Sequence, residues 1–287
     1  MTSLAFDDAS RAAFAAAYPE APARIPHHLL GHPLLTIEAL AELGARHPAD
    51  KVEYNQGALP IGVDIDATPA NGLTIEETIR AIEECGSWMV LKNVERDPAY
   101  GALLADVLAE MLPVIEPVTG PMRRTEAFIF VSSPDAVTPF HFDPEHNILL
   151  QVRGTKTMTV FPADDPEIAS HFAHEAFHMG EHHRNLPWQD TFASRGTAIT
   201  LEAGQAIHVP VKAPHWVKNG PDVSISLSVT WRSDWSANEA DARLANHYLR
   251  KLGLDPRAPG RFPVQNHAKA IAHRAYAKVR RTMTGNS

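Results

Sequence analysis

A histidine and a carboxylate two residues apart, His141 and Asp143, are the side chains of this sequence best placed to bind a metal. On an extended chain, residues i and i+2 point to the same side, so the imidazole and the carboxylate would converge while Phe142 points away. Two histidines and one carboxylate on one face of a metal hold ferrous iron and leave coordination positions open. The segment therefore predicts two of three ligands, and the other histidine must come from elsewhere.

The third predicted ligand is His215, in the segment from Gly204 to Asn219. The order of Gly204, Pro210, His215 and Asn219 resembles the second sequence motif of the cupins, with Lys212 where that motif usually has glycine. Gly204 would permit the turn into one strand, and Pro210 would end it before His215 begins the next. A hydrogen-bonded core histidine is the alternative, but the H-x-D segment upstream favours a metal ligand.

The surrounding elements predict a mostly β domain with flanking helices. Short β-prone stretches separated by glycine and proline suggest a sandwich or barrel, and a double-stranded β-helix (jelly roll, cupin-like) fits their number. We expect this core at 126–232, with a histidine-rich helical insert at 165–190, N-terminal helical segments and strands at 1–125, and a helical segment at 233–287. The expected strands are 88–91, 127–131, 147–152, 156–161, 197–201, 205–209, 215–218 and 223–231.

Several helix starts are also predicted. Thr36 is a candidate N-cap, and Asp97 before a proline marks another start. Capping boxes begin at Thr74 and at Ser236, each with a glutamate three residues later. The histidine-rich helix is expected over 165–179, opened by an Asp-Pro pair.

The chain around the H-x-D segment resembles the JmjC/cupin-like iron(II)- and 2-oxoglutarate-dependent oxygenases, and most of all their asparaginyl-hydroxylase (factor-inhibiting-HIF) branch. The resemblance rests on Thr-Pro-Phe-His-Phe-Asp at 138–143, on Asn147, on Gln-Val-Arg-Gly-Thr-Lys at 151–156, and on the His215 motif. With varying strength it covers residues 88–232. The flanking helical segments carry no motif that can be transferred.

The resemblance implies a role for six residues. Lys156, thirteen residues after the metal aspartate, would bind the distal carboxylate of 2-oxoglutarate, and Thr138 would reach the same carboxylate. Asn147 would line the co-substrate pocket. The implied iron(II) ligands are His141, Asp143 and His215.

This chemistry predicts an oxygenase. Three protein ligands leave about half of an octahedral iron free for a bidentate 2-oxo acid and dioxygen. A dicarboxylate needs a cation at its far end, which Lys156 would supply, although most lysines just after a turn are simply exposed. We expect a hydroxylase of an unidentified prime substrate, either a protein side chain or a small molecule. A non-enzymatic cupin-like ligand-binding or transcriptional regulatory protein is the alternative.

A second metal motif competes with the first. His174, Glu175 and His178 form an H-E-x-x-H, the zinc-peptidase signature, which on a helix presents both histidines on one face. The extended pattern of that class is absent, because Arg184 stands where its third histidine would be. With sixteen histidines in the chain, coincidence is the better explanation. We expect a solvated face or a lid over the barrel mouth, where a fortuitous transition-metal site could form; the role of the 171–183 histidine cluster stays open.

Composition limits the partners. Among 287 residues the net charge is −8, which argues against a nucleic acid or an anionic membrane as partner. One cysteine suits a reducing cytoplasm, and no signal peptide or membrane-spanning apolar run is evident. The family resemblance suggests homodimerisation through the C-terminal helices.

Overall fold

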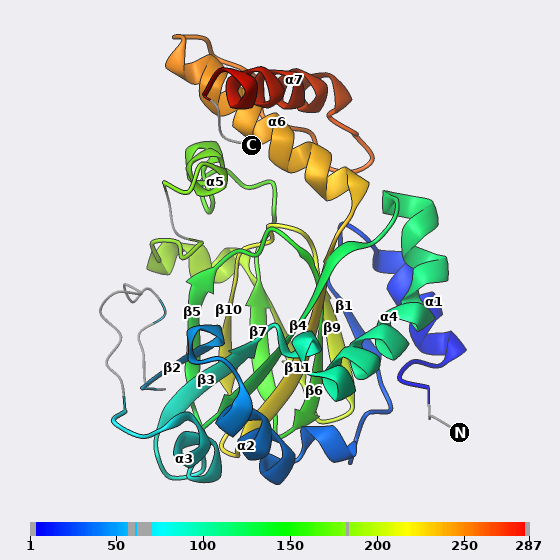
Figure 1. Ribbon diagram of the computed structural model, residues 1–287, viewed down its shortest axis with the longest axis vertical. Coiled ribbons are helices and arrows are strands. Elements are labelled where there is room, and N and C mark those ends of the chain that lie inside the picture. Colours follow the sequence, from blue (N-terminus) through cyan, green and yellow to red (C-terminus); the bar gives the residue numbers. More distant parts are fainter. Residues whose placement is uncertain (1–3, 57–60, 62–70, 182–183, 285–287) are drawn as a thin grey trace.

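Two antiparallel sheets face one another in the computed structural model, which describes residues 4–56, 61, 71–181 and 184–284 (Figure 1). The larger sheet has the strand order β1-β9-β6-β11-β4-β3-β2, and the smaller has the order β5-β10-β7-β8. The strands are β1 (Ala23–Pro26), β2 (Val52–Gln56), β3 (Ser87–Lys92), β4 (Arg123–Ser132), β5 (Val137–His141), β6 (His146–Arg153), β7 (Lys156–Val160), β8 (Thr197–Leu201), β9 (Gln205–Val209), β10 (His215–Asn219) and β11 (Ser224–Arg232).

Strands β4 to β11 form the predicted jelly roll. Each strand expected between 127 and 231 is present, with small shifts at its ends. β1 was not expected, because a four-residue segment ending in proline carries no strand periodicity; it forms by pairing with the edge of β9. β1, β2 and β3 widen the larger sheet beyond the jelly roll.

β11 shows how one strand serves two environments. It lies between β4 and β6 and alternates serine or threonine with aliphatic residues. Because side chains alternate across a strand, Ile225, Leu227 and Val229 join the apolar core, while Ser228 and Thr230 face a cavity between the sheets. The polar face of the larger sheet is thereby turned toward the smaller sheet.

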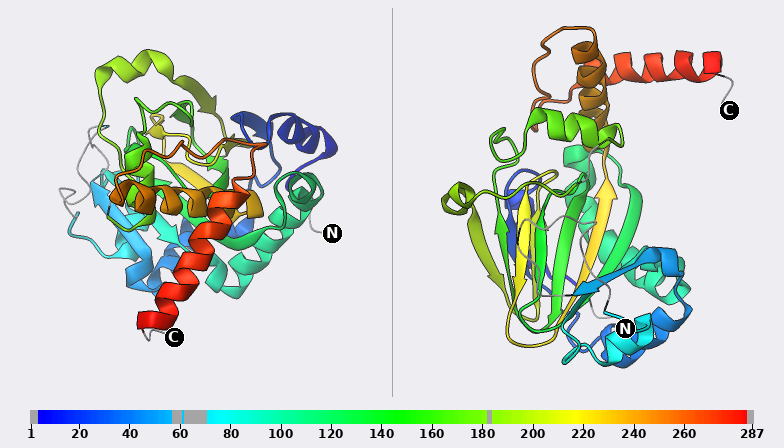
Figure 2. Two further views of the ribbon diagram at one scale, coloured as in Figure 1. Left: turned by 90° about the horizontal axis from the view of Figure 1, so that it is seen from above. Right: turned by 90° about the vertical axis from the view of Figure 1, so that its left-hand side faces the viewer.

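Four helices cover the outer face of the larger sheet, where they share its apolar core (Figure 2). They are α1 (Asp8–Ala17), α2 (Ile37–Arg46), α3 (Ile75–Arg80) and α4 (Pro98–Thr119). The caps predicted at Thr36 and Asp97 and the capping box at Thr74 are confirmed. Short 3-10 helices occupy Pro33–Leu35, Ala49–Lys51, Val94–Arg96 and Asp190–Arg195.

Three further helices lie beyond one end of the sheets (Figure 1). They are α5 (His171–His178), which packs on α6 (Asp234–Lys251), and α7 (His267–Thr284), which packs on α6 and extends past it to the side (Figure 2). None of the described helices combines the length and the apolar character needed to cross a bilayer.

Two predicted helix starts were wrong. α6 begins earlier, because Ser233 directly follows β11 and forms a capping box with Ser236, which is therefore the third residue of the helix rather than its cap. α5 begins only after Ser170, whose hydroxyl accepts from the backbone N–H of Ala173. Asp165 closes a turn by accepting from the backbone N–H of Glu167 instead of opening a helix.

Candidate functional site

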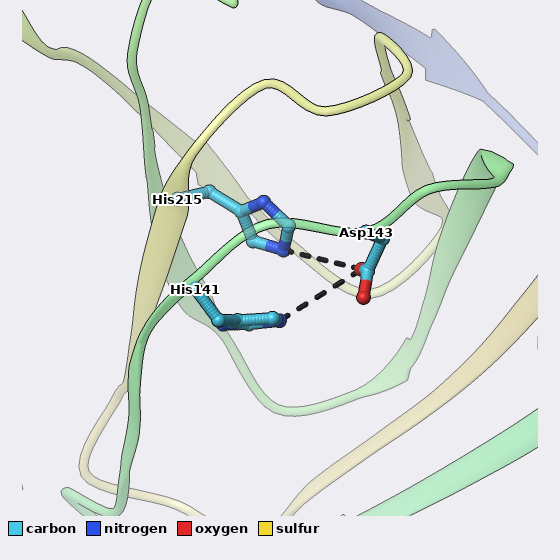
Figure 3. Close-up of side chains that lie close together, drawn as sticks. All are labelled: His141, Asp143 and His215. Carbon is cyan, nitrogen blue, oxygen red and sulfur yellow. Dashed lines mark ion pairs between the residues drawn. The ribbon is translucent and has the colours of Figure 1, made fainter. Parts of the chain in front are cut away.

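His141, Asp143 and His215 converge at the end of the smaller sheet (Figure 3). His141 ends β5 and His215 begins β10, and the antiparallel pairing of these strands sets the two residues opposite each other. Asp143 lies two residues beyond β5 with its carboxylate turned toward both rings. Its Oδ2 is 3.8 Å from His141 Nε2 and 3.6 Å from His215 Nε2. Strand pairing therefore brings the predicted third ligand to the first two.

The backbone fixes each imidazole through its other ring nitrogen. His141 Nδ1 is 2.7 Å from the carbonyl oxygen of Pro139, and His215 Nδ1 is 2.9 Å from that of Ala213. A carbonyl oxygen can only accept, so each Nδ1 carries the proton and each Nε2 keeps its lone pair. Both Nε2 atoms face Asp143, so each ring is in the tautomer and orientation that a metal ligand needs.

Burial sets the protonation of the three side chains. It lowers the pKa of His141 to about 3 and also lowers the pKa of His215. Burial alone would raise the pKa of Asp143, but the neighbouring His141 and Arg184 lower it to about 2. At neutral pH the group consists of two neutral imidazoles and one carboxylate, which are the forms that bind a metal.

The group fits a divalent iron ion. Its ligand atoms all lie within 4.8 Å of one another. Adjacent ligands of an octahedral metal with bonds of about 2.1 Å are about 3 Å apart, so side-chain movements on the order of 1 Å would complete the site. Among the residues that the structure describes, no other cluster of three His, Cys, Asp or Glu could share a metal ion.

Lys156 begins β7 and faces the same cavity as the candidate metal-binding group, which consists of His141, Asp143 and His215. Only 4% of the residue is exposed, so it is not the solvated turn lysine that the sequence allowed. Within the described part of the chain its Nζ has no hydrogen bond or ion pair, and it lies 6.0 Å from the ring centroid of Phe130. Burial lowers the pKa of Lys156 to about 7. A buried amine without an anion beside it is unfavourable, and a ligand carboxylate would relieve that cost.

Thr138 on β5 and Asn147 on β6 line the same cavity, which has a volume of about 290 Å³. Ser228 Oγ donates to Asn147 Oδ1 at 2.8 Å, which orients the amide and directs its nitrogen away from that contact. The structure thus brings together in one cavity all six residues that the sequence singled out.

Comparison with known protein families matches residues 70–236 to the cupin-like domain. The chain belongs to this family. The match covers the strands from β3 to β11 and therefore every residue of the site described above.

The individual proteins that resemble this cupin-like protein share little sequence identity with it. A plant protein named lysine-specific demethylase JMJ31, from Arabidopsis thaliana, is 25% identical over an alignment of 136 residues. The alignment covers 43% of this chain and 24% of that protein. Two solved structures of YcfD from Escherichia coli, one of them described as a ribosomal oxygenase in complex with cobalt and 2-oxoglutarate, are each 15% identical with a TM-score of 0.49. Each comparison covers 92% of this chain and 66% or 65% of the YcfD chain.

Arg184 is a site residue of the cupin-like protein that sequence reasoning missed. Its Nη1 donates to Asp143 Oδ1 at 2.8 Å. This contact occupies one carboxylate oxygen and leaves Oδ2, the one nearest both histidines, for a metal. Arg184 comes from the irregular chain between α5 and β8, where no periodicity marks a residue as facing inward.

Two further ion pairs line the cavity. Arg232 Nη2 donates to Glu145 Oε1 at 2.6 Å, and Lys92 Nζ donates to Glu53 Oε2 at 2.5 Å. Burial raises the pKa of Glu145, although the adjacent Arg232 opposes this. The alternating polar residues of β11 were the available signal for Arg232, because they mark the strand face turned toward the cavity.

The H-E-x-x-H motif does lie on a helix, α5, but it is engaged in packing. Glu175 is 1% exposed and accepts from Arg250 Nε at 3.1 Å. His174 is 1% exposed, and its ring centroid lies 4.6 Å from that of Phe142. Glu175 is therefore not free to act as a base, and the described residues offer no third ligand for His174 and His178.

The expectation of a solvated face is wrong for His174, because it is buried against the H-x-D segment. α5 instead covers the cavity, and its Phe177 is one of the lining residues. His182 and His183, which the sequence places in the same cluster, lie outside the described residues.

Proposed function

We propose that this protein is an Fe(II)- and 2-oxoglutarate-dependent oxygenase that hydroxylates a protein side chain or a small molecule. One observation carries the proposal: two histidines and a carboxylate, in the protonation states that a metal needs, share a cavity with a buried lysine that has no anionic partner among the described residues. The cupin-like family assignment supports the same conclusion.

The residues have distinct tasks in this proposal. His141, Asp143 and His215 hold iron(II) from one side and leave the side toward the cavity open. When bound, the iron supplies the chemistry that couples oxidative decarboxylation of 2-oxoglutarate by dioxygen to oxidation of a C–H bond. Lys156 pairs with the distal carboxylate of the co-substrate, and Thr138 donates a second hydrogen bond to it.

The remaining walls of the cavity are mixed. Phe128, Phe130, Leu149 and Met158 contribute apolar surface that excludes water from the reacting centre. The cavity has a volume of about 290 Å³. Once 2-oxoglutarate is bound, only a narrow group can approach the metal, so we propose a single side chain of a polypeptide or a small metabolite as prime substrate.

The test is formation of succinate from 2-oxoglutarate by the iron-loaded protein with ascorbate and dioxygen, measured without a prime substrate. We expect turnover in the wild type and in Lys218→Met, which removes an exposed lysine of β10 outside the cavity. His215→Ala should abolish turnover. Tight binding of iron and 2-oxoglutarate without any succinate, with or without candidate substrates, would favour the non-enzymatic ligand-binding alternative.

Homodimerisation through the C-terminal helices is part of the proposal. α7 packs only its inner face on α6 and leaves apolar side chains exposed, with Ile271 at 63% and Met283 at 81%. A second copy of the chain would cover this surface. Light scattering gives the molecular mass of the wild type and of Ile271→Glu in solution. A monomeric wild type would refute the proposed homodimer.

A further inference from the structure

Lys212 lies in the turn between β9 and β10 in a backbone conformation that lysine rarely adopts. Its φ is +61°, in the left-handed region that favours glycine. A lysine here strains the backbone, and such strain persists only where the surroundings hold it in place.

The side chain of Lys212 is fixed by buried contacts with α6, and these contacts hold the strained backbone in place. It is 1% exposed and forms an ion pair with Glu239 of α6, which is also 1% exposed. Arg243, one turn further along α6, donates from Nε to the other oxygen of Glu239 at 2.5 Å. Burial alone would raise the pKa of Glu239, but Lys212 and Arg243 lower it well below its usual value, so the carboxylate is ionised.

The backbone of the same residue contacts a predicted metal ligand. The N–H of Lys212 donates to the carbonyl oxygen of Asp143 at 2.8 Å. Asp143 belongs to no strand, so no sheet pairing fixes its orientation. Among the described residues, two hydrogen bonds to Asp143 do so instead: the one from the Arg184 guanidinium to the carboxylate, and the one from the Lys212 N–H to the main chain.

We propose that Lys212 is a positioning residue of the metal centre: its ion pair with Glu239 holds the turn in the left-handed conformation that orients Asp143, and so joins α6 to the metal site. The inference rests on the proposed function, since it requires a metal at the His141, Asp143 and His215 group. A displacement of α6 would therefore change the metal affinity of the site. By the same coupling, metal binding would stabilise the position of α6.

Cobalt(II) binding to the full-length protein tests this without turnover, by titration and by the visible spectrum, which reports ligand geometry. Lys212→Met keeps the length of the side chain and leaves Glu239 neutralised by Arg243, so the fold should persist. Lys212→Gly favours the left-handed turn but has no side chain that could pair with Glu239. Lys218→Met removes one exposed positive charge from β10 and is the matched control.

We expect Lys212→Met to weaken cobalt binding by about tenfold or more and to change the spectrum, since loss of a group that supports a metal ligand typically costs on the order of 10- to 100-fold in affinity. Lys212→Gly should lose less cobalt affinity than Lys212→Met but still bind cobalt more weakly than wild type. Lys218→Met should have the wild-type cobalt affinity and spectrum.

Wild-type affinity and spectrum in both Lys212 variants, with only the melting temperature lowered, would overturn the inference and leave a purely structural ion pair. Full recovery in Lys212→Gly would also overturn it, because backbone conformation alone would then suffice. Absence of cobalt binding in the wild type would instead refute the proposed function, and the inference with it.

Discussion

Replacing Lys156 by alanine should weaken 2-oxoglutarate binding without changing metal affinity. Lys156 is 4% exposed and, among the described residues, has no anionic partner. Its ammonium would meet the distal carboxylate where little water can screen either charge. The alanine variant would leave that carboxylate buried and unpaired.

The expected loss follows from the burial of this pair. Removing one partner of a buried ion pair costs about 3–5 kcal/mol, because the other charge is left uncompensated. At about 1.4 kcal/mol per decade, Lys156→Ala should weaken 2-oxoglutarate binding by about two to three orders of magnitude. Lys156→Arg should recover only part of this, since the guanidinium is larger and approaches a carboxylate differently.

The pH dependence provides a second signature of the same residue. Burial lowers the pKa of Lys156 to about 7 in the free protein, and the bound carboxylate would raise that pKa. Above pH 7 binding must therefore take up a proton, so affinity should fall by up to about tenfold per pH unit until the pKa of the bound state is reached. Lys156→Ala should lack this dependence.

Anaerobic calorimetric titration of the metal-loaded proteins with 2-oxoglutarate measures both effects. Metal affinity, measured separately, should be the same in wild type and Lys156→Ala. An alanine variant that binds 2-oxoglutarate as tightly as wild type would refute the role assigned to Lys156. A wild-type affinity that does not change from pH 7 to 9 would contradict the lowered pKa of the free lysine.

Three further predictions concern neighbouring residues. Asp143→Ala should lose most metal affinity in a cobalt titration while circular dichroism shows the fold retained; stoichiometric iron in an active variant would contradict the ligand assignment. Thr138→Val should weaken 2-oxoglutarate binding by about 1 kcal/mol in the same calorimetry, for one lost hydrogen bond, and no change would exclude that contact. Glu175→Gln should lower the melting temperature because Arg250 loses the buried one of its two carboxylate partners, Glu175 and Asp255, without affecting succinate formation; a chelator-sensitive peptidase activity of the wild type that disappears in this variant would restore the zinc-peptidase interpretation.

The candidate ligands could be predicted because the signals for them are local. His141 and Asp143 are two residues apart, and the turn around Pro210 places His215 at the start of a strand. Lys156 was recognisable only by its spacing from Asp143. Its burial, which separates a ligand-binding lysine from an exposed one, required the structure.

The residues that were missed depend on contacts between distant segments. Arg184 lies in irregular chain and reaches Asp143 only because α5 folds back over the cavity. The start of α6 was misplaced because Ser233 caps the helix in place of Ser236, and Glu239, which the sequence assigns to a capping box, pairs with Lys212 instead.

The face of β11 that carries Ser228 and Thr230 lines the cavity, and this affects which substitutions the protein can accept. Hydrogen bonds to β4 and β6 on both sides fix the backbone of the strand, whatever its side chains are. Ser228 and Thr230 form part of the cavity wall, yet neither belongs to the metal-binding group. Ser228 also donates to Asn147, so a substitution there would change the proposed co-substrate pocket as well. A substitution of Thr230 would reshape the wall of the cavity while His141, Asp143, His215 and Asn147 keep their contacts.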